Sequence, residues 1–217
     1  VGCSLDCKFC ATSQLDRMRN LNVDEIFDQV VAIDQQCKTY FNIPLSNIVF
    51  MGMGEPLMNY NNVLGAIEKI TSPEGLGMAS KRITLSTSGI PKLIRKMADD
   101  GVKFNLAVSL HSAIQETREK IMPFSKKFPV EDLLSSLEYW YEATQKMVTI
   151  EFIVWKGIND NLDEVRALIN FCRKFQSKVN LIEYNPIGDD TFEQGSKEAM
   201  SMYQKKLTSA RITNTIR

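Results

Sequence analysis

The chain has 217 residues, of which 44% are hydrophobic, enough to bury a large core without disulfide or metal staples. Its 26 Lys and Arg residues balance 26 Asp and Glu residues, so the chain as a whole lacks the basic surplus typical of nucleic-acid binders. No run of 18 apolar residues and no secretory leader is visible, so we expect a cytoplasmic protein without a membrane span. Four short basic runs could form a local basic face, although solvated surface is the ordinary explanation of such runs: 81–82, 92–96, 126–127 and 205–206.

Short, largely apolar runs alternate along the chain with helical patterns. The runs predict strands at 47–52, 82–87, 104–111, 148–155, 179–184 and, more weakly, 212–216. The intervening patterns predict helices at 23–40, 61–70, 91–100, 130–144, 162–175 and 196–209. At the first helix, Asn22 and Glu25 form a capping-box pattern, and Gly101 ends the third.

The repeated order of strand and helix predicts one α/β domain over residues 1–217 with a parallel sheet. Five or six strands fit a partial, (β/α)6-like TIM barrel better than a closed eightfold barrel. We also expect a strand that ends just before Val1, without which a sheet edge is exposed. In such folds the chemistry lies at the carboxyl ends of the strands.

Three of the five cysteines, Cys3, Cys7 and Cys10, are spaced C-x3-C-x2-C. An odd number of cysteines, crowded at one end, argues against a disulfide framework and for a metal site. Thiolates are the usual ligands of iron–sulfur clusters, and three of them can ligate three irons of a cubane. The fourth iron then stays open to chelate S-adenosylmethionine (SAM), and one-electron reduction breaks a carbon–sulfur bond of SAM to release a deoxyadenosyl radical.

A structural zinc site is the alternative for these three cysteines. Zinc favours four ligands, commonly three Cys and one His, and the single histidine, His111, ends a predicted strand. The other two cysteines, Cys37 and Cys172, continue helical apolar stripes, which predicts that both are buried small hydrophobic residues.

Polar and glycine residues follow several predicted strands. Gly54 and Glu55 lie in the sequence MGMGEP directly after the first strand, where glycine lets a ligand approach the backbone. The carboxylate of Glu55 is predicted to accept hydrogen bonds from the SAM ammonium. Ser86 and Ser88 end the second strand, residues 109–111 end the third and Asn185 follows the fifth. Each position singly is typical of a turn or helix cap, but together they predict one binding rim.

Together these segments resemble the RlmN/Cfr family of radical SAM adenosine methyltransferases. The matching segments are 1–12 (VGCSLDCKFCAT), 19–21 (RNL), 51–57 (MGMGEPL), 59–62 (NYNN), 81–89 (KRITLSTSG), 106–112 (LAVSLHS), 122–123 (MP) and 180–186 (NLIEYNP). The resemblance implies a [4Fe-4S] cluster on Cys3, Cys7 and Cys10. It also implies a set of SAM contacts: Gly54, Glu55, Ser86, Ser109, Leu110, His111 and Asn185.

The same resemblance implies methylation of an adenine ring carbon, position 2, in large-subunit ribosomal RNA and, in some members, transfer RNA. It implies a monomer that receives electrons from a flavodoxin or ferredoxin. Residues 13–18 depart from the family pattern, and the family's methyl-carrying cysteine segment and N-terminal RNA-gripping domain are absent. We therefore expect that cysteine beyond Arg217, so that the chain itself holds no catalytic residue for methyl transfer. The alternatives are another radical SAM hydrogen-abstracting enzyme and a non-enzymatic zinc or iron–sulfur protein.

Overall fold

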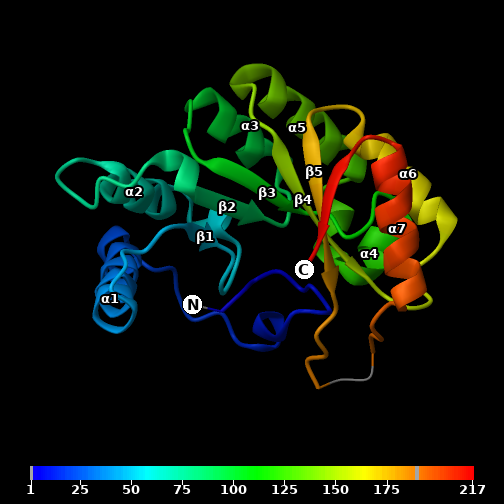
Figure 1. Ribbon diagram of the computed structural model, residues 1–217, viewed down its shortest axis with the longest axis horizontal. Helices are drawn as coiled ribbons and strands as arrows, with labels where there is room; N and C mark the ends of the chain where they lie inside the picture. Colours follow the sequence, from blue (N-terminus) through cyan, green and yellow to red (C-terminus); the bar gives the residue numbers. More distant parts are fainter. Residues whose placement is uncertain (1, 189–190) are drawn as a thin grey trace.

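The computed structural model describes residues 2–188 and 191–217, so Val1, the first residue of the cysteine motif, lies outside the described residues. Within them, six parallel strands form one sheet in sequence order, each beside its chain neighbour (Figure 1). The strands are β1 (Ile48–Phe50), β2 (Ile83–Thr87), β3 (Asn105–Ser109), β4 (Val148–Val154), β5 (Ser177–Glu183) and β6 (Thr213–Ile216). All six lie where the sequence predicts them, and the α/β class is confirmed.

The helices that connect the strands match the predicted set, with one addition. They are α1 (Val23–Phe41), α2 (Tyr60–Thr71), α3 (Pro91–Asp99), α4 (Gln115–Ile121), α5 (Val130–Thr144), α6 (Leu162–Cys172) and α7 (Lys197–Ser209). Short 3-10 turns are η1 (Ala11–Gln14), η2 (Pro56–Asn59), η3 (Ser80–Arg82) and η4 (Pro123–Lys127). The capping box of α1 is present, since the Asn22 side chain accepts from Glu25 and the Glu25 carboxylate accepts from Asn22.

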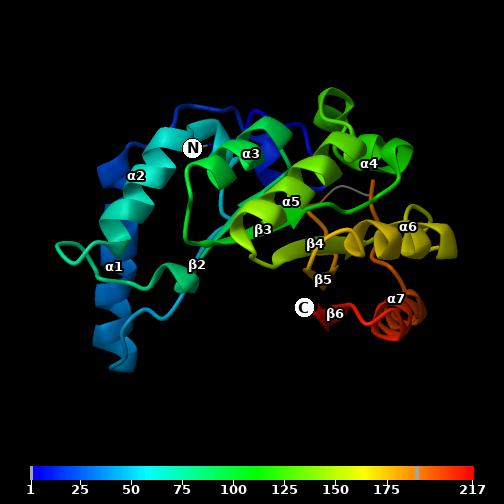
Figure 2. The same cartoon turned by 90° about the horizontal axis from the view of Figure 1, so that it is seen from above.

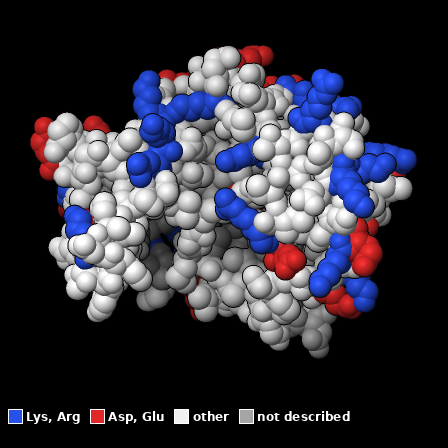
Figure 3. Space-filling view, in the orientation of Figure 1, with Lys and Arg blue, Asp and Glu red and all other residues white. Residues whose placement is uncertain are grey.

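The helices form an arc on one side of the strands, as a partial barrel requires, and the opposite face of the sheet is left uncovered by helices (Figure 2). Figure 3 shows this face hollowed, with Lys and Arg side chains gathered over its upper part and right side. The neutral net charge of the chain therefore conceals an uneven distribution. No described helix is long and apolar enough to cross a membrane.

The core lies between the sheet and the arc of helices. Central strand β4 is buried along almost its whole length, which explains its continuous apolar sequence. Among the described residues β1 pairs with β2 alone, so the sheet has a free edge there and Val49 is 59% exposed. The exposed edge agrees with the sequence, whereas the strand expected before Val1 stays a prediction.

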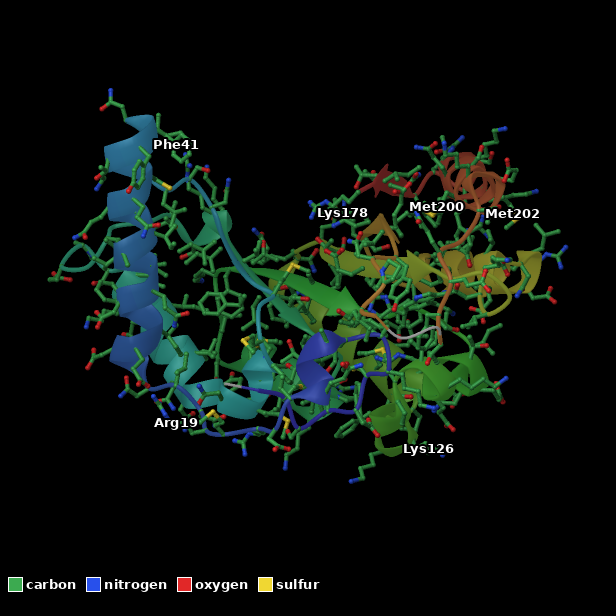
Figure 4. All side chains as sticks on the ribbon, turned by 90° about the horizontal axis from the view of Figure 1, so that it is seen from below. Arg19, Phe41, Lys126, Lys178, Met200 and Met202 are labelled. Atoms are coloured by element: carbon green, nitrogen blue, oxygen red, sulfur yellow. The ribbon has the colours of Figure 1, made fainter. Side chains whose placement is uncertain are left out.

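The apolar stripe predicted along α1 is buried only at its beginning. Ile26 and Val30 reach the core, but Ile33 and Phe41 are exposed and Cys37 is half-buried. The reason is that the second half of α1 projects beyond the sheet, with Phe41 at its far end (Figure 4). The prediction that Cys37 is a buried residue was therefore wrong. Cys172, at the end of α6, is buried as predicted.

Candidate cofactor site

The cysteine loop is closed by its own hydrogen bonds. The Cys10 N–H donates to the Cys7 carbonyl at 3.2 Å, and the Ser13 hydroxyl lies 2.6 and 2.7 Å from the Cys7 and Cys10 carbonyl oxygens. Ser13 belongs to the segment that departs from the family pattern, and here it pins the turn that carries two of the three cysteines. The local sequence therefore fixes the shape of the loop without a disulfide.

The loop docks on α4 and η4. The Lys8 N–H donates to the Ile121 carbonyl and the Phe124 N–H donates to the Asp6 carboxylate, each at 3.0 Å. Phe9, beside the last cysteine, packs edge-on against the His111 ring at 4.8 Å between centroids. These contacts hold the loop at the carboxyl ends of β3 and β4, the edge of the sheet where the fold predicts chemistry.

The Gly-Glu turn lies directly against the start of the cysteine loop. Gly54 has φ +92°, and a Cβ added to it would lie 2.8 Å from the Gly2 carbonyl oxygen, so only glycine fits. Burial raises the pKa of the Cys3 thiol, and the backbone N–H groups of Leu5, which donates to the sulfur at 3.4 Å, and of Glu55 oppose the rise. Two motifs about 50 residues apart in the sequence are thus one site.

The side chain of Glu55 has partners different from those predicted. Its Oε1 accepts from the Leu57 N–H and the Thr87 hydroxyl, and its Oε2 from the Ser88 N–H and hydroxyl, at 2.6–3.0 Å. Two bonds to each oxygen use all the acceptor positions of the carboxylate, so none is left for the SAM ammonium. Burial raises the pKa of Glu55 and these hydrogen bonds oppose the rise. The carboxylate ties the turn to β2, and the backbone at Gly54 and Glu55 remains to contact a ligand.

His111 is held as a neutral residue at the end of β3. It has φ +58°, its backbone N–H and that of Leu110 donate to the Glu151 carbonyl, and its Nδ1 accepts from the Ile153 N–H at 3.2 Å. Burial, and then the charge of Arg118, lower the pKa of His111 to about 3. Because Nδ1 is an acceptor, the ring proton resides on Nε2.

A zinc ion would need side chains that converge on one point. Among the described residues, no three or more His, Cys, Asp and Glu side chains lie close enough together to hold one metal ion. A cubane makes a different demand, because its three protein ligands bind three separate irons and need not converge on a point. The thiols of Cys3, Cys7 and Cys10 form no disulfide. Burial, then the neighbouring Cys10 and Cys3, raise the pKa of the Cys7 thiol to about 12, so a thiolate there calls for a metal and positive charge.

The remaining predicted contacts lie on the same rim. Ser86 is buried in β2 beside Ala107 of β3, and Ser109 ends β3 at the level of Glu151 in β4. Asn185 is exposed two residues after β5. A cavity of about 440 Å³ lies on the β1 side of this rim, lined by Cys3, Gly54 and Glu55 together with residues of α1 and β1. Of the predicted SAM contacts, only Gly54 and Glu55 line this cavity.

Two residues that organise the rim were not identified from the sequence. Asn159 is fully buried, and its amide donates to the His111 and Ile153 carbonyls while its Oδ1 accepts from the Trp155 N–H. It stands in the turn after β4, where an asparagine is ordinary and gives no functional signal. The second is Arg118 of α4.

Arg118 is fully buried and bonds only to backbone carbonyls. Its Nε donates to Leu110, and its Nη2 donates to Ser88 at 2.6 Å and Ser109 at 3.4 Å, which joins the ends of β2 and β3. Its Nη1 is buried with no hydrogen-bond partner. Burial lowers the pKa of Arg118 to about 10, which leaves it a cation at neutral pH. An orphaned buried donor on a cation, within electrostatic range of the Cys7 thiol, fits a site built for an anionic group.

A family model described as the radical SAM superfamily matches residues 1–172. The chain belongs to that superfamily, as its cysteine loop and partial barrel predicted. Along its whole length it is 64% identical to the probable dual-specificity RNA methyltransferase RlmN of Christiangramia forsetii, and equally to that of Flavobacterium johnsoniae. It spans 62% of the length of each of these curated relatives. The predicted resemblance is thereby confirmed.

Solved structures agree with this placement. A radical SAM methyltransferase from Sphaerobacter thermophilus is 33% identical with a TM-score of 0.96, covering all of this chain and 63% of its own. SuiB of Streptococcus suis, bound to S-adenosylmethionine, has a TM-score of 0.68 at 16% identity, covering all of this chain and 48% of its own. The second likeness shows the fold alone.

Proposed function

We propose that the chain is the cofactor-binding core of a radical SAM RNA methyltransferase, with a [4Fe-4S] cluster on Cys3, Cys7 and Cys10. The observation that carries this proposal is the contact of the cysteine loop with the Gly54–Glu55 turn. When bound, the cluster supplies the single electron that breaks a carbon–sulfur bond of SAM. The protein residues bind and orient SAM and keep water away from it.

Each part of the rim has a task in this proposal. The glycine at 54 lets SAM approach the backbone, and Ser86, Ser109 and Asn185 offer polar groups for its ribose and amino-acid oxygens. The 109–111 turn is fixed by Glu151, Asn159 and Arg118, so its backbone groups need no reorganisation when a ligand arrives.

The substrate we propose is an adenine ring carbon, position 2, in large-subunit ribosomal RNA and in transfer RNA. That carbon is not a nucleophile, so a methyl group cannot reach it by polar transfer. The named relatives are dual-specificity RNA methyltransferases, which supports an RNA substrate. Lys126 lies on one side of the cysteine loop and offers positive charge, whereas Arg19 on the other side is paired with Glu25 (Figure 4). We also propose a cytoplasmic monomer that accepts electrons from a flavodoxin or ferredoxin.

The positions of Cys37 and Cys172 support the proposal that neither of them carries the methyl group. Cys37 lies on the projecting half of α1. Cys172 is buried, and its carbonyl accepts from Ser177 at the start of β5, which is the opposite end of the sheet from the rim. The methyl-carrying cysteine is therefore expected outside the 217 residues.

The chain is expected to cleave SAM without methylating RNA. After anaerobic reconstitution and reduction, methionine and deoxyadenosine should form, because the cluster ligands and the rim are all present. With SAM labelled in its methyl group and ribosomal RNA added, adenine should stay unlabelled. Label in adenine would refute the position assigned to the methyl-carrying cysteine, and a failure to form deoxyadenosine would refute the proposed function itself.

Replacing any one of Cys3, Cys7 and Cys10 by alanine is expected to abolish cluster retention, because a ligand to one iron is lost. Cys37→Ala and Cys172→Ala are the matched controls and should keep the iron content of the unmodified chain. Cys172→Ala should cost roughly 1–3 kcal/mol of stability because the side chain is buried, and Cys37→Ala should cost less. Iron analysis and urea unfolding measure both effects. Iron loss in Cys37→Ala with retention in Cys3→Ala would show that the wrong cysteines are assigned.

A further inference from the structure

Arg118 has no acidic partner in its buried site. Its guanidinium carries five N–H donors, its hydrogen bonds to Leu110, Ser88 and Ser109 end on neutral carbonyl oxygens, and its Nη1 has no partner. Among the described residues, none of the ion pairs includes it. A buried cation without a counter-charge is costly, so a fold that keeps one is expected to supply a negative group.

The cysteine loop can hold such a negative group, an iron–sulfur cluster with its thiolate ligands. Arg118 lies one helical turn before Ile121, whose carbonyl accepts the N–H of Lys8, the residue after Cys7. Cys7 packs against the apolar cluster that contains Ile121 and Phe124. The Phe124 ring in turn lies 5.7 Å from the Arg118 guanidinium.

We propose that Arg118 is a positioning residue that supplies the counter-charge of the iron–sulfur cluster and raises its reduction potential. This inference rests on the proposed function, because it requires the cluster on Cys3, Cys7 and Cys10. Reduction adds one electron, and so one negative charge, to a site with little water. A fixed cation nearby favours the reduced form, and net charge and hydrogen bonding around the sulfurs are known levers on cluster potentials. The same guanidinium donates hydrogen bonds to the Ser88, Ser109 and Leu110 carbonyls. The residue that supplies the counter-charge therefore also holds the ends of β2 and β3 in place.

The experiment compares the unmodified chain with Arg118→Gln, Arg118→Lys and Arg166→Gln. Glutamine removes the charge and keeps a hydrogen-bond donor, and lysine keeps the charge. Arg166 is an exposed arginine on α6 and serves as the matched control. Each protein is reconstituted with iron and sulfide, its iron and sulfide content is measured, and its midpoint potential is determined by dithionite titration followed by electron paramagnetic resonance, without SAM.

We expect all four proteins to hold the cluster. In Arg118→Gln the equilibrium between oxidised and reduced cluster should move about tenfold toward the oxidised form, which is ~59 mV toward more negative potential for a one-electron couple. Arg118→Lys and Arg166→Gln should titrate like the unmodified chain. An unchanged potential in Arg118→Gln, or an equal shift in Arg118→Lys, would overturn the inference.

The outcome is also decided if Arg118→Gln loses the cluster. Retention at the normal potential in Arg118→Lys then supports a need for the charge. Loss in both variants overturns the inference, because the shape of arginine and not its charge is then what the site needs. If the unmodified chain itself takes up no cluster, the failure belongs to the proposed function and not to the role of Arg118.

Discussion

Glu55→Gln is expected to destabilise the chain by roughly 1–3 kcal/mol and to loosen the whole rim of the site. The reason is that each carboxylate oxygen accepts one backbone N–H, Oε1 from Leu57 and Oε2 from Ser88. A glutamine places its NH2 group against one of these N–H groups in either orientation of the amide. A buried donor is then left without an acceptor. Urea unfolding followed by circular dichroism measures the loss.

Glu164→Gln is the matched control, because Glu164 is also buried. Its Oε2 accepts from the Ser112 hydroxyl and its Oε1 has no partner, so a glutamine can keep its carbonyl toward Ser112. The substitution also removes a buried charge, and stability should stay the same or rise. If the two variants lost equal stability, the clamp assigned to Glu55 would be wrong.

Glu55→Gln should also reduce both cluster retention and SAM affinity. The turn that the carboxylate holds is the same one whose backbone bonds Cys3. From the sequence alone the cluster is expected to assemble normally in this variant, since the carboxylate is assigned to SAM. The internal hydrogen bonds of the carboxylate favour the opposite outcome, and iron analysis of the variant distinguishes the two.

The fold was largely predictable because its strands are short apolar runs that periodicity detects directly. Helix α4 was missed because its seven residues, QETREKI, show no apolar stripe and its N-cap, Ile114, offers no side-chain cap. The buried residue on that helix, Arg118, carries a charge that sequence patterns assign to the surface. Arg118, on which the further inference rests, was therefore missed for two reasons: its helix is short, and it is buried although it is charged.

The sequence predicted which residues lie at the candidate site, but not which hydrogen bonds they make with one another. Strand ends meet on one rim in a parallel sheet, so Gly54, Ser86 and the 109–111 turn were expected to be neighbours. Which donors satisfy Glu55 depends on how β2 ends against the Gly-Glu turn, a tertiary contact between residues 32 and 33 positions apart. A carboxylate in a glycine-rich turn is consistent with a ligand contact or with an internal clamp, and its hydrogen bonds to Leu57, Thr87 and Ser88 favour the clamp.

Gly54→Ala is expected to weaken SAM binding roughly tenfold to a hundredfold, as about 1–3 kcal/mol of backbone strain implies. Gly54 has φ +92°, which side chains rarely adopt, and an added Cβ would lie 2.8 Å from the Gly2 carbonyl oxygen. The added Cβ would meet the backbone of Gly2, which cannot move aside as a flexible side chain could. The cysteine loop or the turn must therefore move, which displaces Cys3 from the other cluster ligands.

Gly52→Ala, two residues earlier in the same turn, is the matched control for this substitution. Gly52 has no positive φ, and a Cβ added to it would meet no atom within 4 Å. Calorimetric titration of the reconstituted variants with SAM, with iron content measured on the same samples, should show normal behaviour for Gly52→Ala. It should show low iron and weak SAM binding for Gly54→Ala. Equal behaviour of the two variants would mean that the contact between the turn and the cysteine loop does not hold the site together.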